Sequence, residues 1–325
     1  MEINDRNSKG ITFPAQFGIL LGLVGAGLII GGIVSVAIWV FMTGRPLLAM
    51  ETDMLKPEYY NAVMTIQGVS TFFMFFLPVY FTALISYRKP ARFIGFSSNI
   101  SYKQVFIILA ILFLTFPLSG ALGELNKIIP IPIKWAAKFK AMENSRAAEE
   151  AALININSFS KYIISLVMIG LLPGIFEEVC FRAGLQNILT RWFKGPWIAI
   201  IITSIVFSLV HISYYGFLVR FALGIILGFI FYYSGNIWLS ALFHFLYNGL
   251  QVTALYVFTL AGNKDQKDIE ENFPIWAGVV ALVLIYYLFM QFKKLSLIQR
   301  AKIKDDDSMS LGTKIGNVRR KYFRK

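Results

Sequence analysis

Long stretches without any charged residue constrain this 325-residue chain more than any other feature of its sequence. Six runs of at least 20 residues contain no Asp, Glu, Lys or Arg: 10–44, 59–87, 104–123, 195–219, 221–263 and 272–292. A helix needs roughly 20 apolar residues to cross the hydrocarbon core of a bilayer, which is about 30 Å thick. Charged residues make up only 15% of the chain, whereas soluble domains carry about 25%. The sequence therefore predicts an integral membrane protein.

Two further features bring the number of predicted spans to eight. The run 221–263 is too long for one helix, and its Ser-Gly-Asn signal at 234–236 divides it in two. Apolar sequence on both sides of Glu177, Glu178 and Arg182 predicts another span, which holds these charges. The predicted spans are 17–42, 62–86, 105–122, 163–190, 197–214, 217–233, 237–258 and 275–292. The expected fold class is all-α, a polytopic membrane bundle of about eight transmembrane helices.

The distribution of basic residues predicts the orientation. Eight spans put both termini on one side, and placing them in the cytoplasm leaves 20 Lys and Arg inside and 10 outside, as the positive-inside rule prefers. We therefore expect a multi-pass protein of the cell membrane with cytoplasmic termini and a retained first span. The segment 124–161, which begins near an Ile-Pro-Ile-Pro-Ile-Lys-Trp sequence, predicts an interfacial helix outside. The high apolar content and the scattered basic residues argue against disorder and against nucleic-acid partners.

Ionisable residues inside the predicted spans are the main functional signal. Each costs roughly 2.5 to 3.5 kcal/mol at the bilayer centre, so a cluster of them needs a reason. Four places stand out: Glu177-Glu178-x-x-x-Arg182, Phe207-x-x-x-His211, Arg220 and His244-x-x-x-Asn248. At about 1.5 Å per residue, Glu177 and His211 lie at similar depths on different helices. The sequence therefore predicts one intramembrane chamber lined by these groups.

Helical spacing predicts which of these side chains act together. Residues i and i+4 share a face, so Glu178 is expected to form an ion pair with Arg182, which leaves Glu177 as the unpaired carboxylate. The Phe207 ring is expected to wall the site. Arg220, near one end of its span, is interpreted as a side chain that snorkels to the interface. The single cysteine, Cys180, is interpreted as inert packing.

The residues alone leave three functions open. A hydrolytic enzyme, a small-solute transporter with a proton relay, and a non-catalytic membrane scaffold or immunity protein would all place Glu, His and Arg in the membrane. A transporter is often built from inverted repeats with broken helices, and this sequence has no internal repeat. The motifs H-E-x-x-H and G-x-S-G, and a Gly-x-Gly-Asp aspartyl motif, are all absent.

The ordered set of motifs on successive hydrophobic helices resembles the CPBP (CAAX protease and bacteriocin-processing, Abi) family of intramembrane proteases. That family includes the type II CAAX prenyl endopeptidases and bacterial proteins linked to bacteriocin processing and self-immunity. The resemblance covers residues 160–255. The resulting domain prediction is a cytoplasmic N-terminus (1–16), N-terminal membrane helices with an interfacial loop (17–158), a protease core (159–260), and a last span with a basic cytoplasmic tail (261–325).

The resemblance implies a role for each residue. Glu177 would be the general base that activates water, and His211 would help to position that water. His244 and Asn248 would stabilise the oxyanion, while three residues would shape the site: Glu178, Arg182 and Phe207. The implied substrate is a membrane-embedded or lipid-anchored polypeptide.

The resemblance does not decide whether the site binds a metal ion. A zinc ion on Glu177, His211 and His244 is the alternative to a metal-free site. Glu177 cannot easily be both ligand and base, which favours the metal-free mechanism and no cofactor.

Overall fold

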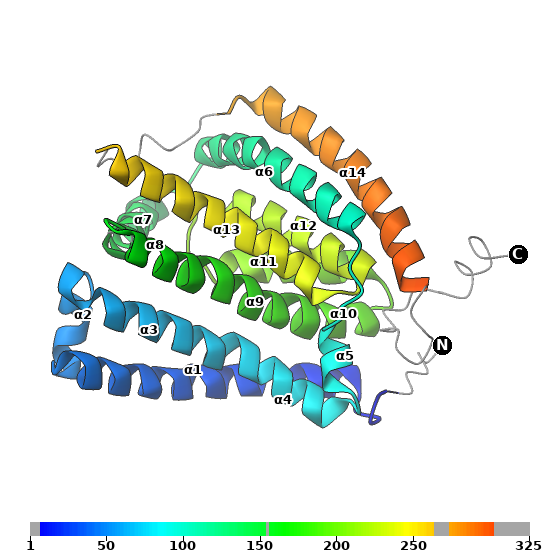
Figure 1. Cartoon of the computed structure of the whole chain (residues 1–325), viewed down its shortest axis with the longest axis horizontal. Coiled ribbons are helices and arrows are strands. Elements are labelled where there is room, and N and C mark those ends of the chain that lie inside the picture. Colours follow the sequence, from blue (N-terminus) through cyan, green and yellow to red (C-terminus); the bar gives the residue numbers. More distant parts are fainter. Residues whose placement is uncertain (1–6, 154–155, 263–272, 302–325) are drawn as a thin grey trace, which may run out of the picture.

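The computed structural model describes residues 7–153, 156–262 and 273–301, and within these ranges it is built from helices without a β-strand (Figure 1). By length and composition, seven helices among these described residues are able to cross a membrane, so the chain is a multi-pass membrane protein. The predicted all-α polytopic class is confirmed. The first described helix begins, and the last one ends, on the same side of the bundle.

The N-terminal part forms a hairpin of long helices along one side of the bundle (Figure 1). The elements are α1 (Phe13–Thr43), η1 (Leu47–Ala49), α2 (Met50–Asp53), η2 (Pro57–Tyr59), α3 (Tyr60–Thr71), the π-helical turn η3 (Phe72–Phe76), α4 (Leu77–Ser86) and α5 (Pro90–Ile94). The Asp53 carboxylate fixes the connection between the two long helices, because it accepts hydrogen bonds from Lys56 and Arg45. The Lys56 hydrogen bond, with that of Arg45, lowers the pKa of Asp53.

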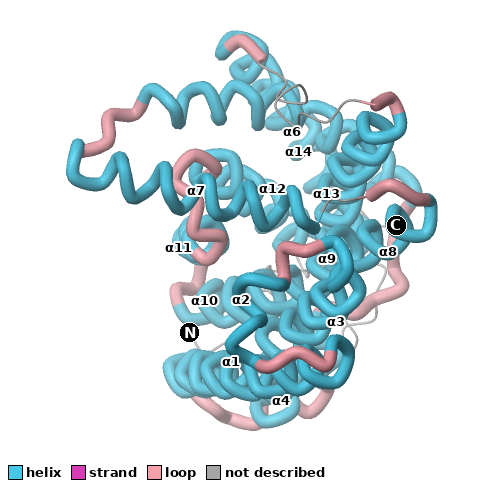
Figure 2. Tube along the Cα trace, turned by 90° about the vertical axis from the view of Figure 1, so that its left-hand side faces the viewer, coloured by secondary structure: helices cyan, strands magenta, loops and turns pink. Residues whose placement is uncertain are grey.

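Two long helices pack on the opposite side. They are α6 (Tyr102–Ile128) and α14 (Ile275–Ala301), and Gly278 of α14 meets Ala121 of α6 so closely that a Cβ there would lie 2.4 Å from the alanine methyl group. A further helix, α7 (Ile133–Leu153), lies crosswise to the long helices at one end of the bundle (Figures 1 and 2). The segment 124–161 thus contains the predicted helix.

The central helices and the turn after α11 carry all the predicted site residues. They are α8 (Phe159–Ser165), the π-helical turn η4 (Leu166–Leu171), α9 (Leu172–Glu178), the π-helical segment η5 (Val179–Gln186), α10 (Asn187–Trp192), α11 (Pro196–Leu209), α12 (Phe217–Ser234) and α13 (Ile237–Leu260). The segments from α8 to α10 form one continuous span, Phe159–Trp192.

One predicted span is shorter than expected. The sequence predicts a helix over 197–214, but α11 ends at Leu209 after 14 residues and is too short to count among the seven long helices. The chain turns at Ile212, which has a positive φ of 48°. This conformation is uncommon for a residue with a branched side chain, and it ends the helix in spite of continuing apolar sequence. His211 therefore lies in a turn and not within a helix.

Two glycines allow α12 to approach α11 closely. A Cβ on Gly224 would lie 2.9 Å from Ser204 Cα, and a Cβ on Gly228 would lie 2.9 Å from a side-chain carbon of Ile200. The spacing of these glycines is that of a GxxxG motif, which lets helix backbones pack closely in membranes. This contact fixes the position of α12 beside the helix that leads to His211.

Replacing Gly224 by alanine is expected to destabilise this contact. The nearest obstacle includes the Ser204 backbone, which cannot swing away, and overpacking typically costs about 1 to 3 kcal/mol. Gly32→Ala in α1 is the matched control, because apart from its own helix backbone no atom lies within 4 Å of its Cβ position. Thermal unfolding of both purified variants measures the difference. Equal melting temperatures of the two variants would show that α11 and α12 can move apart at Gly224 without a loss of stability.

Candidate active site

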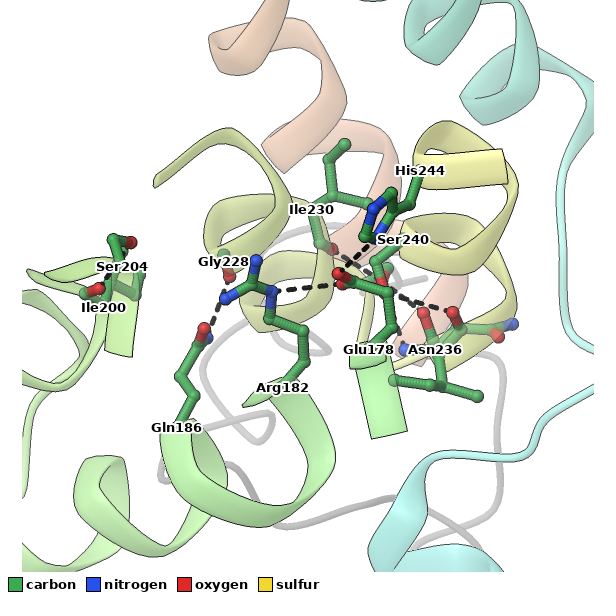
Figure 3. A network of polar contacts seen from close by, with 12 residues as sticks. Glu178, Arg182, Gln186, Ile200, Ser204, Gly228, Ile230, Asn236, Ser240 and His244 are labelled. Atoms are coloured by element: carbon green, nitrogen blue, oxygen red, sulfur yellow. Dashed lines mark hydrogen bonds and ion pairs between the residues drawn. The ribbon is translucent and has the colours of Figure 1, made fainter. Parts of the chain in front are cut away.

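Glu178 links two of the predicted site residues into a buried network (Figure 3). Its Oε2 accepts a hydrogen bond from Arg182 Nε at 3.1 Å, and its Oε1 lies 3.1 Å from His244 Nδ1. The side chains of Glu178 and Arg182 are completely buried. The predicted ion pair is therefore present, and the contact with His244 joins residues that are 66 positions apart.

A close helix contact brings Glu178 beside His244. Gly174 lies one turn before Glu178, and a Cβ on it would lie 3.0 Å from the backbone nitrogen of Phe245. Only a glycine lets α9 and α13 approach to this distance without a shift of backbone. Gly174 was not among the residues predicted from the motifs, although a small residue one turn from a buried charge is a signal that could have indicated it.

Pro173 explains the position of Asn248. Proline has no amide N–H to donate to the carbonyl one turn earlier, which is that of Ile169. The Nδ2 atom of Asn248 lies 3.4 Å from this carbonyl oxygen and donates to it. The second hydrogen of the Asn248 amide stays available for another acceptor, since each amide nitrogen carries two.

Glu177 differs from its neighbour in both exposure and contacts. Its side chain is partly exposed, whereas Glu178 is buried. Its Oε2 atom is buried and has no hydrogen-bond partner among the described residues. It interacts electrostatically with His244, Glu178, Arg182 and Arg220. A carboxylate held within a polar cluster, with a free acceptor atom, is suited to bind water or a substrate group.

The Phe207 ring lies at the centre of the arrangement. Its centroid is 5.0 Å from the ring of His211, 5.9 Å from the ring of His244 and 5.1 Å from the guanidinium carbon of Arg182. Phe207 is nearly fully buried. The two histidines and the arginine thus surround one aromatic side chain, as expected for a residue that walls the site.

The turn after α11 fixes the orientation of His211. Its Nδ1 atom lies 2.8 Å from the carbonyl oxygen of Phe207. A carbonyl oxygen only accepts hydrogen bonds, so Nδ1 carries the proton and a neutral His211 presents its lone pair at Nε2. The strained φ of Ile212, the next residue, belongs to the same turn.

Helices α6 and α7 cover this turn. The Ser213 hydroxyl donates to Glu143 Oε2 at 2.9 Å, and the Tyr214 ring stacks on Phe139 with centroids 5.0 Å apart. Asn126 at the end of α6 bonds the turn as well, by donating to the Tyr214 carbonyl at 3.0 Å. Asn126 is 2% exposed and was missed, because one amide in a mixed segment gives no distinctive sequence signal.

The snorkelling interpretation of Arg220 is wrong. Its guanidinium folds back over Gly216, its Nη1 atom is buried, and it interacts electrostatically with Glu177 and Tyr247. The turn before α12 is held by contacts with α6 and α7, and the Arg220 side chain folds back over this turn. Arg220 therefore adds a positive charge near Glu177 that the motifs did not include.

Other predicted or missed residues have structural contacts. Cys180 is 7% exposed and packs in the main hydrophobic core, as expected for an inert thiol. Gln186 is buried in η5, and its Nε2 atom donates to the Gly228 carbonyl at 2.9 Å, which joins η5 to α12 (Figure 3). A buried amide inside an apolar run is the sequence signal that could have indicated Gln186.

The residues proposed for zinc do not form a metal-binding group. Among the described residues, no three His, Cys, Asp or Glu side chains are gathered closely enough to hold a metal ion. Of the proposed set, His244 directs Nδ1 to Glu178, and Glu177 lies near it. Glu177, His211 and His244 are not gathered into such a group, so no chemical step is derived through a metal.

Comparison with known families gives an independent result for the same part of the chain. Residues 159–250 match the family model described as type II CAAX prenyl endopeptidase Rce1-like. The predicted resemblance is confirmed for this segment. The Rce1-like segment runs from the start of α8 into α13 and contains every predicted site residue. No curated protein and no solved structure matched the chain.

The Rce1-like segment accounts for the arrangement of the site. This segment is similar to the type II CAAX prenyl endopeptidase Rce1-like family, and the similarity covers α8 to most of α13. The N-terminal hairpin, α6, α7 and α14 lie outside it, yet α6 and α7 supply the contacts that hold the His211 turn. The site is thus built inside the matched segment and supported from outside it.

Proposed function

We propose that this protein is an intramembrane endopeptidase that hydrolyses a peptide bond of a membrane-embedded or lipid-anchored polypeptide, with water activated by Glu177. The observation that carries the proposal is the division of labour between two adjacent carboxylates. Glu178 is buried and paired with Arg182 and His244, whereas Glu177 is partly exposed with an acceptor atom free among the described residues. A scaffold or immunity protein would need neither the free carboxylate nor the oriented histidines.

In the proposed reaction Glu177 acts twice, first as a base and then as an acid. Glu177 removes a proton from water, and His211 accepts a hydrogen bond from the same water through Nε2. The hydroxide oxygen bonds to the carbonyl carbon, and the resulting oxyanion faces His244 and Asn248. The tetrahedral intermediate then breaks its C–N bond. Glu177 returns the proton to the leaving nitrogen, which gives a carboxylic acid and an amine. The proton of the acid then passes to the amine or to solvent, which leaves a carboxylate.

The oxyanion role fixes the charge that His244 must carry. Its Nδ1 proton is directed at the Glu178 carboxylate, so a neutral ring would present only a lone pair at Nε2. A hydrogen bond from Nε2 to an oxyanion therefore requires the imidazolium form. Glu178 supplies the negative charge that stabilises this form, which makes it a positioning residue for His244 as well as the partner of Arg182.

The substrate class is tested with two peptides that end in a CAAX sequence and differ only in a prenyl group on the cysteine. The full-length protein in lipid nanodiscs is expected to cleave the prenylated peptide faster, because the lipid holds the scissile bond at the membrane. Mass spectrometry identifies the products, and the Glu177→Gln protein controls for a contaminating protease. Failure to cleave any membrane-bound peptide, together with solute uptake into vesicles, would favour the transporter.

The same assay tests the metal-free mechanism. Prolonged chelation is expected to leave cleavage unchanged, since His244 and Asn248 act as hydrogen-bond donors in this proposal. Elemental analysis of the protein before and after chelation accompanies the assay. Zinc that is bound stoichiometrically, and that is lost and restored together with activity, would reassign His211 and His244 as metal ligands.

A further inference from the structure

A cavity lies away from the candidate active site, where α11 begins and where α12 and α14 end. Its volume is about 310 Å³, and it is lined by Pro196, Trp197, Tyr232, Tyr233, Lys293, Leu297 and Arg300. This volume is at the lower end of the range of roughly 300 to 1,000 Å³ that is typical of small-molecule sites. None of these residues belongs to the network around Glu178.

The cavity is lined by two cations and by no carboxylate. Arg300 is only 4% exposed, and its Nη1 atom lies 3.5 Å from the carbonyl oxygen of Tyr232. Lys293 is exposed, and its ammonium group lies 5.4 Å from the centre of the Tyr233 ring. A buried guanidinium beside an exposed lysine favours an anion, and a guanidinium matches the geometry of phosphate oxygens.

The aromatic side chains place this cavity at a membrane boundary. Trp197 is 63% exposed and stands at the start of α11, two residues after the turn between α10 and α11. Tryptophan and tyrosine are enriched at headgroup level, and basic pockets between transmembrane helices on the cytoplasmic side bind anionic headgroups. The predicted orientation puts this cavity on the cytoplasmic side, where anionic lipids face the protein.

We propose that this cavity binds the phosphate group of an anionic phospholipid from the surrounding leaflet, with Arg300 and Lys293 as the phosphate ligands. Trp197 and the two tyrosines pack beside the glycerol region. A bound lipid joins the ends of α12 and α14 to the start of α11. It thereby stabilises α11 and α12, the two helices that the His211 turn connects. The site is independent of the peptidase proposal.

The experiment compares phosphatidylglycerol and phosphatidylcholine with identical acyl chains, bound to the full-length protein in detergent. Native mass spectrometry measures lipid affinity, and thermal unfolding measures stabilisation. The variant is Lys293→Gln, which removes an exposed charge and should fold. Lys294→Gln is the matched control, because Lys294 is also exposed and carries the same charge but does not line the cavity.

We expect phosphatidylglycerol to bind more tightly than phosphatidylcholine and to raise the melting temperature. Lys293→Gln should weaken phosphatidylglycerol binding about fivefold, the effect of one basic side chain near an anionic headgroup, and Lys294→Gln should leave it unchanged. Equal losses in both variants would show a diffuse charge effect and overturn the site. Displacement of the lipid by millimolar inorganic phosphate would identify a free anion as the ligand and overturn the lipid proposal.

Discussion

The Glu177→Gln protein is expected to insert and fold like the wild type. It should cleave its peptide substrate roughly 10²- to 10⁴-fold more slowly, which is the usual contribution of a general base. The amide keeps the size of the side chain but cannot take a proton from water. Folding should be preserved because Glu177 Oε2 has no hydrogen-bond partner in the described structure that would be lost. Single-turnover cleavage and thermal unfolding of the same preparation measure both properties.

The adjacent carboxylate provides the comparison for this result. If Glu177 and Glu178 were interchangeable, either glutamine variant would lose activity and stability alike. The structure predicts instead that activity is lost without stability in the Glu177 variant. Cleavage at the wild-type rate by the Glu177→Gln protein would contradict the role of Glu177 as the base. A large fall in the melting temperature of the same protein would contradict the assignment of the structural role to Glu178 alone.

The Glu178→Gln protein is expected to lose roughly 3 to 5 kcal/mol of stability, because removing one partner leaves the buried Arg182 charge without compensation. Both side chains are completely buried, so solvent cannot take the place of the lost carboxylate. Glu124→Gln is the control for loss of an ion pair. Glu124 and Lys127 form an exposed pair at 2.9 Å, and breaking such a pair costs at most about 1 kcal/mol.

A double variant separates the structural role of Glu178 from its role toward His244. Glu178→Gln with Arg182→Met removes both buried charges and keeps a long side chain against Phe207, so folded yield should recover. Cleavage should stay about 10²- to 10³-fold below the wild type, because His244 has lost the carboxylate that stabilises its imidazolium form. A double variant that folds and cleaves normally would show that Glu178 has only a structural role.

The bounds of most central helices were predictable from local properties of the sequence. The predicted spans 217–233 and 237–258 agree closely with α12 (Phe217–Ser234) and α13 (Ile237–Leu260). Apolar runs and turn signals decide these helices, because every residue in the membrane must satisfy its own backbone hydrogen bonds. The predicted helix 197–214 extends beyond α11, since its apolar run continues past the point where packing under α7 turns the chain.

The resemblance of residues 159–250 to the Rce1-like family could likewise be predicted from sequence, and the role of each residue stays a prediction. The spacing of Glu178 and Arg182 is local to one helix, so their pairing followed from helical geometry. The direction of Arg220 did not, because the snorkelling interpretation assumed that its end of the span reaches water. The preceding turn has tertiary contacts with α6 and α7, and the Arg220 guanidinium folds back over this turn near Glu177 instead.

The sequence by itself determined that this chain crosses the membrane many times and carries ionisable residues within its spans, because hydropathy and helical spacing are local properties. Only the tertiary structure decided that Glu178 meets His244, that Pro173 leaves a carbonyl for Asn248, and that Phe207 contacts both histidines. These contacts depend on how closely separate helices approach. That approach is set by glycines such as Gly174, whose importance depends on what lies opposite them.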